Sequence, residues 1–79
     1  GISSDGRYLV YLEISPDESC HVNVSDRWNS NSLRNPCPEE LGQNIKGWHP
    51  SFNSNGRQIL WYNPETKKRL MTENSLINY

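Results

Sequence analysis

The sequence predicts an all-β fold built from antiparallel hairpins. Its apolar residues fall in short runs, rich in β-branched and aromatic side chains, that are bounded by turn-forming residues. Asp5-Gly6 and Asn55-Gly56 each stand shortly before such a run, and both dipeptides favour the backbone of tight turns. Only 33% of the residues are hydrophobic, yet three Trp, four Tyr and one Phe are present, and disordered chains are usually poor in these residues. A length of 79 residues accommodates one small domain at most.

The first half of the chain carries the strongest strand pattern. Residues 7–14 are almost continuously apolar, which is typical of a strand covered on both faces. Pro16 and Asp17 mark a turn, because proline presets φ and aspartate bonds back to the backbone. Residues 20–24 then alternate between apolar and polar side chains, which predicts a half-buried return strand. We therefore expect a hairpin over residues 7–24.

The middle of the chain is polar, and we expect most of it to be irregular. Residues 26–47 are dominated by Asn, Ser and Pro. Within them, residues 39–41 are expected to make one helical turn, because Pro38 suits the first position of a helix. An irregular stretch of about twenty residues is uncommon in a small domain unless it has a function or packs on a partner.

The second half repeats the plan of strand, turn and strand. Residues 48–52 open it, and the apolar run at residues 58–62 predicts the next strand. Residues 68–73 alternate in polarity, so they are expected to form the return strand of a second hairpin. Residues 74–79 are expected to form a last short strand or to dock on a neighbour.

The two halves are related by an offset of fifty residues. Few aligned pairs are identical, but every pair keeps its physical type. The pairs are Ile2 with Phe52, Ser4 with Ser54, Asp5 with Asn55, Gly6 with Gly56, Arg7 with Arg57, Leu9 with Ile59, Val10 with Leu60 and Tyr11 with Trp61. Periods of about 20 to 50 residues mark solenoids and propellers, in which one unit cannot bury a core alone.

These motifs resemble the PD40 repeat, a WD40-like repeat of TolB-type β-propellers. The family pattern is Pro-x-Phe/Trp-Ser-Pro-Asp-Gly-Lys/Arg followed by an apolar strand. The second copy reads Pro50-Ser51-Phe52-Asn53-Ser54-Asn55-Gly56-Arg57, and the first carries the shorter match Ser3-Ser4-Asp5-Gly6-Arg7. Ser4 and Ser54 depart from the pattern by replacing the proline before Asp-Gly. Asn55 replaces the aspartate, a mild change because Asn and Asp share their turn chemistry.

The resemblance implies about two β-propeller blades. Residues 1–47 would be an incomplete first blade with a long polar loop, and residues 48–79 a partial second blade. It gives a structural turn role to Asp5, Gly6, Asn55 and Gly56, and it leaves Arg7 and Arg57 exposed at strand starts. Since propellers typically contain four to eight blades, we expect completion by further chain or by oligomerisation.

Cys20 and Cys37 leave two interpretations open. A disulfide between them would close a loop of about 16 residues and contribute about 3 kcal/mol. It would also indicate a periplasmic or secreted protein. In the other interpretation, one thiol lies in a core and the other in a loop. Asn23-Val24-Ser25 is a glycosylation sequon, although so short a pattern often occurs by chance.

No residue pattern identifies a catalytic or metal site. Neither His21 nor His49 has an Asp or Glu at metal-ligand spacing, and the sequence contains no CxxC and no Gly-x-Ser-x-Gly. Glu39-Glu40 is a carboxylate pair on a predicted loop, where such neighbours are usually solvated. We therefore assign no catalytic residue, no metal and no cofactor.

Trp28, Trp48 and His49 are the candidate binding residues. Trp28 and Trp48 flank the polar middle segment, and each has a polar or charged neighbour. Exposed Trp rings of this kind stack on sugars, but packing at a protein interface explains the same residues and is the favoured interpretation. Trp61 lies within a predicted strand at a repeat position and is expected to pack in the core.

These patterns favour a non-catalytic interaction or scaffold module. The net charge is −1 and the only basic cluster is residues 67–69, so we expect no nucleic-acid partner. No apolar run reaches the roughly 18 residues that a membrane span needs. The expected partners are a protein or further blades, a second copy of the chain, or a glycan. The alternatives are a carbohydrate-binding lectin assembled as a multi-chain propeller, and the propeller portion of a larger enzyme such as a serine peptidase.

Overall fold

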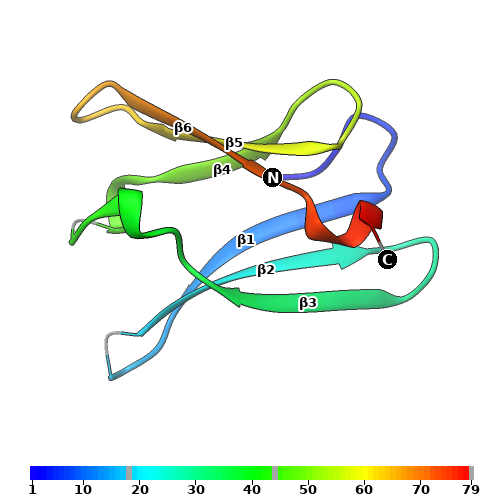
Figure 1. The fold of residues 1–79 in the computed structure, drawn as a ribbon, viewed down its shortest axis with the longest axis horizontal. Helices are drawn as coiled ribbons and strands as arrows, with labels where there is room; N and C mark the ends of the chain where they lie inside the picture. Colours follow the sequence, from blue (N-terminus) through cyan, green and yellow to red (C-terminus); the bar gives the residue numbers. More distant parts are fainter. Residues whose placement is uncertain (18, 44, 79) are drawn as a thin grey trace.

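Two antiparallel sheets of three strands each face one another in the structure (Figure 1). The computed structural model covers residues 1–79 and describes all of them except residues 18, 44 and 79. The first sheet contains β1 (Tyr8–Ile14), β2 (Cys20–Asp26) and β3 (Asn31–Pro36), in that order. The second sheet contains β4 (His49–Phe52), β5 (Gln58–Asn63) and β6 (Lys68–Glu73), also in order. The predicted all-β, antiparallel fold is confirmed.

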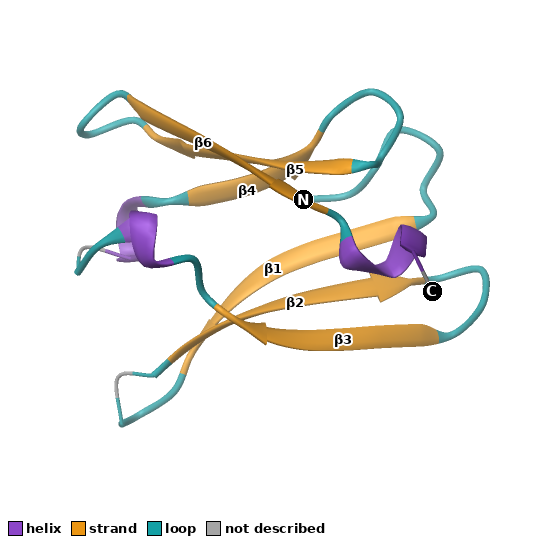
Figure 2. Ribbon diagram, in the orientation of Figure 1, coloured by secondary structure: helices purple, strands orange, loops and turns teal. Residues whose placement is uncertain are grey.

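Three short 3-10 helices complete the described chain (Figure 2). η1 (Glu39–Leu41) and η2 (Ile45–Gly47) lie between β3 and β4, and η3 (Ser75–Asn78) follows β6. The helical turn expected after Pro38 is confirmed as η1. The chain after β6 does not form the expected last strand, because η3 packs back on β2 and β3 with Leu76 buried. The part of that expectation that concerns residue 79 lies outside the described residues.

The expectation of a mostly irregular middle segment is wrong, because β3 pairs with β2 within it. Leu33 of β3 lies opposite Val24 and packs against the core. The other side chains of β3 are polar or proline, and the strand forms the edge of its sheet. An exposed edge strand of this kind has no apolar alternation by which the sequence could reveal it.

β1 and β2 form the predicted hairpin, with Val10 directly opposite Val24. Both valines are buried, whereas Tyr11 on the other face of β1 is 49% exposed. The prediction that both faces of β1 are covered is therefore wrong for this structure. The sequence misled because apolar Leu9 and Tyr11 occupy the outward positions, which hides the alternation.

The core lies between the two sheets. Its buried apolar side chains come from both sheets, from η1 and η3, and from the residue before β4: Tyr8, Val10, Val22, Val24, Leu41, Trp48, Ile59, Trp61 and Leu76. The rings of Tyr8 and Phe52 meet across the sheets with their centroids 6.1 Å apart. Trp61 is 1% exposed, so the expectation that it packs in the core is confirmed, and its indole N–H donates to Oγ1 of Thr72 at 2.9 Å. The polar atom of this buried ring is thereby satisfied.

A disulfide between Cys20 and Cys37 ties the segment that follows β3 to the start of β2. The two Cα atoms lie 5.5 Å apart. The Cys37 amide also donates a hydrogen bond to the Cys20 carbonyl at 3.2 Å, so the backbone already holds the two residues together. The segment leading to η1 therefore leaves the first sheet from a fixed point.

Removing this disulfide should destabilise the fold. The two cysteines are 17 positions apart in the sequence, and closing a loop of that size restricts the unfolded chain by about 3 kcal/mol. We expect Cys20→Ser/Cys37→Ser to unfold in urea with a free energy lower by about that amount. Tryptophan fluorescence provides the measurement, and an unchanged urea midpoint would contradict the expectation.

Candidate functional site

The two predicted turn motifs share one backbone geometry. Gly6 and Gly56 have φ angles of 75° and 72°, in the left-handed region that glycine adopts without strain. The Gly6 amide donates to the Ser3 carbonyl at 2.9 Å, and the Gly56 amide donates to the Asn53 carbonyl at 3.0 Å. Both turns therefore close through the same hydrogen bond.

The residue before each glycine also makes the same contact. Oδ1 of Asp5 accepts from the Arg7 amide at 3.0 Å, and Oδ1 of Asn55 accepts from the Arg57 amide at 2.9 Å. Asp and Asn are interchangeable here because both offer an acceptor oxygen at this position. The change from Asp5 to Asn55 between the copies thus leaves the turn intact.

Strand pairing repeats between the halves as well. Apart from Ile14–Cys20, each pair in the first hairpin has a counterpart in the second, 50 residues later in the leading strand and 47 later in the return strand. The equivalent pairs are Ile2–Leu9 and Phe52–Ile59, Tyr8–Asp26 and Gln58–Glu73, and Val10–Val24 and Leu60–Met71. The internal repeat is therefore structural and extends through both strands of each hairpin.

Equivalent side chains nevertheless meet opposite environments in the two sheets. Val10 and Val24 are 0% and 1% exposed, whereas their counterparts Leu60 and Met71 are 36% and 57% exposed. On the first sheet, the face that carries Val10 and Val24 is covered by the second sheet. The equivalent face of the second sheet points away from the first sheet and is uncovered. The sheets stack in the same sense, like successive units of a repeat, and not as two halves that present the same face to each other.

We define the outer face of the second sheet as Ser51, Leu60, Tyr62, Arg69 and Met71. A shallow hollow of about 570 Å³ lies on this face. The Arg69 guanidinium lies 5.6 Å from the ring centroid of Tyr62, within the range of a cation–π contact. Clustered exposed apolar side chains with a polar rim are typical of interaction surfaces. The alignment of Leu60 with Val10 shows from the sequence alone that the two positions are equivalent. It does not show which of the two is covered.

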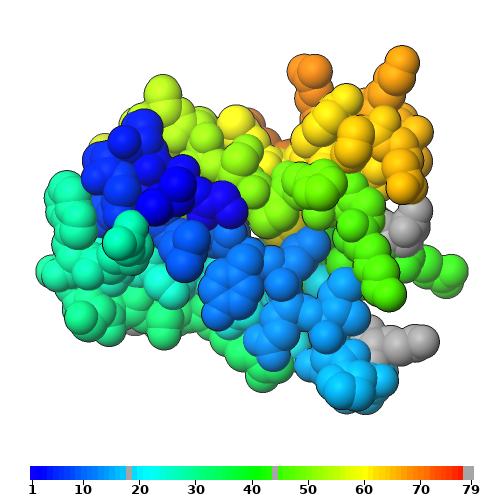
Figure 3. Space-filling model, turned by 180° about the vertical axis from the view of Figure 1, so that it is seen from behind, coloured from blue at the N-terminus to red at the C-terminus, as the bar shows by residue number. Residues whose placement is uncertain are grey.

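The N-terminal residues pair with the edge of β1 and reach the start of the second sheet. Figure 3 shows them in dark blue beside the yellow-green residues of the second half. The Gly1 amine donates to the Val10 carbonyl at 2.7 Å, and the Val10 amide donates back at 2.9 Å. A Cβ on Gly1 would lie 2.8 Å from the Pro50 carbonyl oxygen, which is too close for any side chain. Ser4 donates its hydroxyl to the Ser54 carbonyl at 3.1 Å. These contacts fix the position of the second sheet relative to the first.

Arg7, Asp26 and Trp28 form a corner where β1 begins and β2 ends. The Arg7 guanidinium makes two hydrogen bonds to Asp26, at 3.1 Å from Nε and 2.9 Å from Nη2. Asp26 also accepts from the Trp28 amide at 3.1 Å and from the Asn29 side chain at 3.0 Å. The Arg7 guanidinium, helped by these two donors, holds the pKa of Asp26 well below its usual range.

The same guanidinium supports an exposed aromatic ring. It lies 5.2 Å from the ring centroid of Trp28 and 5.0 Å from that of Tyr8. Its bond to Asp26 raises the pKa of Arg7 above the ordinary value. The expectation that Arg7 is exposed at a strand start is therefore wrong, because its side chain is 30% exposed and paired, whereas Arg57 is exposed as expected.

The structure does not bring the predicted binding residues together. Trp28 is 63% exposed in the turn between β2 and β3. Trp48 is 5% exposed and donates its indole N–H to the Leu41 carbonyl at 2.9 Å, so it belongs to the core and not to a binding surface. His49 is exposed on β4. The β2–β3 turn and the η1–η2 segment lie at opposite ends of the molecule (Figure 1).

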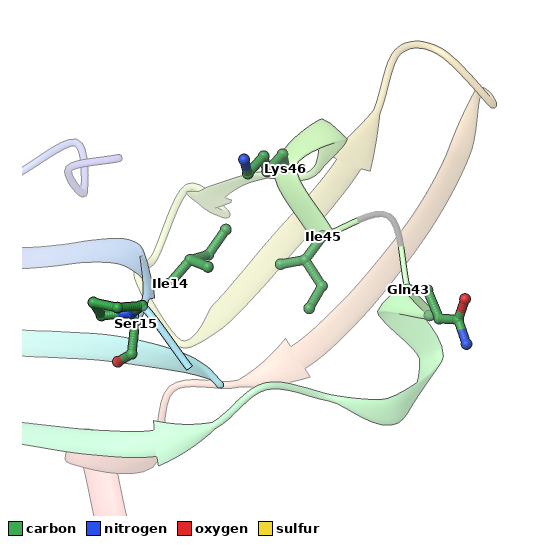
Figure 4. Close-up of a pocket in the computed structure, with 7 residues that line it drawn as sticks. Ile14, Ser15, Gln43, Ile45 and Lys46 are labelled. Atoms are coloured by element: carbon green, nitrogen blue, oxygen red, sulfur yellow. The ribbon is translucent and has the colours of Figure 1, made fainter. Parts of the chain in front are cut away.

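A second hollow lies at the end of the molecule that carries η2 (Figure 4). It is an open cleft of about 1040 Å³ between the β1–β2 turn and the η2 segment, lined by Ile14, Ser15, Pro16, Gly42, Gln43, Ile45 and Lys46. Figure 4 shows Gln43 pointing away from the cleft. Among these lining residues Lys46 is the one charged side chain, and a single cation does not define a ligand.

The histidines and acidic residues do not gather into a site in the described part of the chain. No group of three or more His, Cys, Asp or Glu side chains among the described residues is placed to hold a metal ion. Nδ1 of His21 is buried and has no hydrogen-bond partner. Glu39 and Glu40 are exposed in η1. Across the described ranges, no helix has the length and apolar character to cross a membrane.

Comparison with known proteins gives no relative: no family model matches the chain, and neither does any curated protein or solved structure. The two halves of the chain are therefore the comparison that guides its functional interpretation.

Asp26 should make the fold sensitive to acid. Its pKa is depressed in the folded state, so the stabilisation is fully present above the unfolded value near pH 4 and is lost as the pH falls towards the lower folded value. We expect the free energy of unfolding to decrease below about pH 4, and Asp26→Asn to flatten that decrease. Glu40→Gln, at an exposed position of η1, is the control and should keep the wild-type profile. Urea unfolding at several pH values provides the measurement, and a wild-type profile for Asp26→Asn would contradict this role.

Proposed function

We propose that the chain is a non-catalytic interaction module of a stacked-sheet array, of the kind formed by PD40 repeats in TolB-type β-propellers. One observation carries the proposal. The outer face of the second sheet is the repeat equivalent of the face that is buried on the first sheet. A unit that ends on such a face is built to be covered by a further sheet.

The proposed mechanism is recognition by surface complementarity. A covering sheet would remove Leu60, Tyr62 and Met71 from water, as the second sheet removes Val10 and Val24. Fully burying a large apolar side chain contributes about 1.5–3 kcal/mol, and each of these side chains, which are 36–57% exposed, would contribute a part of that amount. Arg69 and Ser51 supply a polar rim around them. No reaction is assigned, and in the serine peptidase alternative the catalytic groups would lie outside this module.

A glycan-binding role is the second candidate, and the Arg7–Asp26–Trp28 corner favours it. Trp28 is 63% exposed, its ring is held by Arg7, and Asn29 and Asn31 beside it are exposed amides. An aromatic ring flanked by amides suits a sugar. The burial of Trp48 leaves Trp28 without the second ring that the sequence suggested. In either role the Cys20–Cys37 disulfide supports a periplasmic or secreted location.

Extending the chain by one repeat should stabilise it. Asp26 and Glu73 hold equivalent positions, so residues 1–73 can be joined directly to a second copy of residues 27–79. The added copy carries Cys37→Ser, because its partner Cys20 is not repeated, and η3 with Leu76 then follows the added sheet. The added unit would supply a third sheet. The side of its β5 that carries Ile59 and Trp61 would cover the outer face of the original second sheet. We expect the melting temperature to rise by about 5 °C or more, measured by circular dichroism in dilute solution.

The controls for this experiment use one substitution in two places. Leu60→Asp in the middle sheet of the extended chain should abolish the gain, because it charges the newly covered face. Leu60→Asp in the last sheet should preserve the gain, because that face stays open. The proposal would be overturned by an extended chain no more stable than the original, or by equal effects of the two substitutions.

A further inference from the structure

The first sheet also has an exposed outer face, and the residues equivalent to it in the second sheet are buried. Ile2 pairs with Leu9, and both lie on the same side as Tyr11. Their counterparts in the second half are Phe52, Ile59 and Trp61, which face the first sheet in the core. We define the outer face of the first sheet as Ile2, Leu9 and Tyr11.

This face is exposed in the structure. Ile2 is 53% exposed and Tyr11 is 49% exposed, whereas Ile59 and Trp61 are 3% and 1% exposed. Two faces meet in the contact between the sheets, and each has an equivalent face that is exposed. One exposed face lies on the outer side of the first sheet, and the other lies on the outer side of the second sheet. Of the large hydrophobic side chains exposed among the described residues, all except Ile14 and Trp28 lie on these two outer faces.

We propose that separate copies of this chain associate head to tail, with the outer face of the second sheet of one copy covering the outer face of the first sheet of the next. This inference rests on the proposed function and names the partner as a second copy. Leu60 and Met71 of one copy would meet Leu9 and Tyr11 of the other, as Val10 and Val24 meet Ile59 and Trp61 within the chain.

The charges on the two faces are compatible with this contact. Arg69 borders one face and Glu13 borders the other, and Glu13 is held by Arg34 at 3.0 Å. Asn23 also donates to Glu13 at 3.0 Å, so the carboxylate is fixed in place. The pKa of Glu13 is lowered, chiefly by its hydrogen bond to Arg34, so in this contact Arg69 would approach a carboxylate that is already paired.

The contact is heterologous, since it joins two different faces. Repeating such a contact leads either to a closed ring or to a growing chain of copies. A chain of copies that does not close keeps one free face of each kind, one at each of its ends. This property separates it from a two-fold dimer, in which one face would meet itself. It also allows a complementation test with two substitutions.

The test measures association of the full chain by sedimentation velocity over a wide concentration range. We expect the wild-type chain to associate as its concentration rises. Leu60→Asp blocks one face and Tyr11→Asp blocks the other, and each alone should weaken association about tenfold or more. Both positions are exposed, so the variants should keep the wild-type circular dichroism. Met71→Glu and Ile2→Glu provide a second pair of face variants.

The mixture of the two variants gives the decisive result. Each variant keeps one working face, so an equimolar mixture of Leu60→Asp and Tyr11→Asp should form a one-to-one dimer and nothing larger. Ile14→Asp, an exposed apolar position outside both faces, should associate like the wild type.

The inference would be overturned by a wild-type chain that stays monomeric at millimolar concentration, by a mixture that stays monomeric, or by an effect of only one of the two substitutions. If the chain extended by one repeat is stabilised while separate copies do not associate, the proposed function stands and only the head-to-tail contact falls. If the extended chain gains nothing, both fall.

Discussion

The burial of the Val10–Val24 pair beneath the second sheet is the interaction on which the rest of the structure depends. A three-stranded sheet of this size cannot bury enough surface by itself, so its apolar face needs a cover. The second sheet supplies that cover with Ile59 and Trp61, and the contact between Tyr8 and Phe52 fixes how the sheets lie. Because the second sheet repeats the plan of the first, its far side carries the equivalents of Val10 and Val24, and the proposed function is that a further sheet covers them. These equivalents are the exposed Leu60 and Met71.

Local features at both ends of the strands of the first sheet hold the chain in place. At one end, Arg7 and Asp26 join the start of β1 to the end of β2 by paired hydrogen bonds. At the other end, the Cys20–Cys37 disulfide anchors the segment that leads to η1 and to buried Leu41. These contacts lie near the strand ends and leave the two outer faces clear. The molecule therefore combines fixed strand ends with open faces, which is the arrangement that the proposed stacking requires.

The sequence predicted the strands that carry a clear pattern and missed those that do not. β1, β2, β5 and β6 have apolar periodicity between recognisable turns, and the repeat itself was readable from the alignment of Asp5-Gly6 with Asn55-Gly56. β3 escaped because an exposed edge strand carries no such periodicity. Trp48 was expected at a surface, yet its burial depends on η1, whose Leu41 carbonyl accepts its indole proton. Likewise, alternation shows that a strand has two faces, but only the packed structure shows which face is covered.

The direction in which the two sheets stack is the central claim, and a nuclear Overhauser spectrum of the chain in dilute solution tests it most directly. The rings of Tyr8 and Phe52 have centroids 6.1 Å apart, so their protons should give strong cross-peaks. Tyr11, on the opposite face of β1, should show none to Phe52. Cross-peaks between Tyr11 and Phe52, with none from Tyr8, would mean that the second sheet covers the other face of the first and would contradict the same-sense stack.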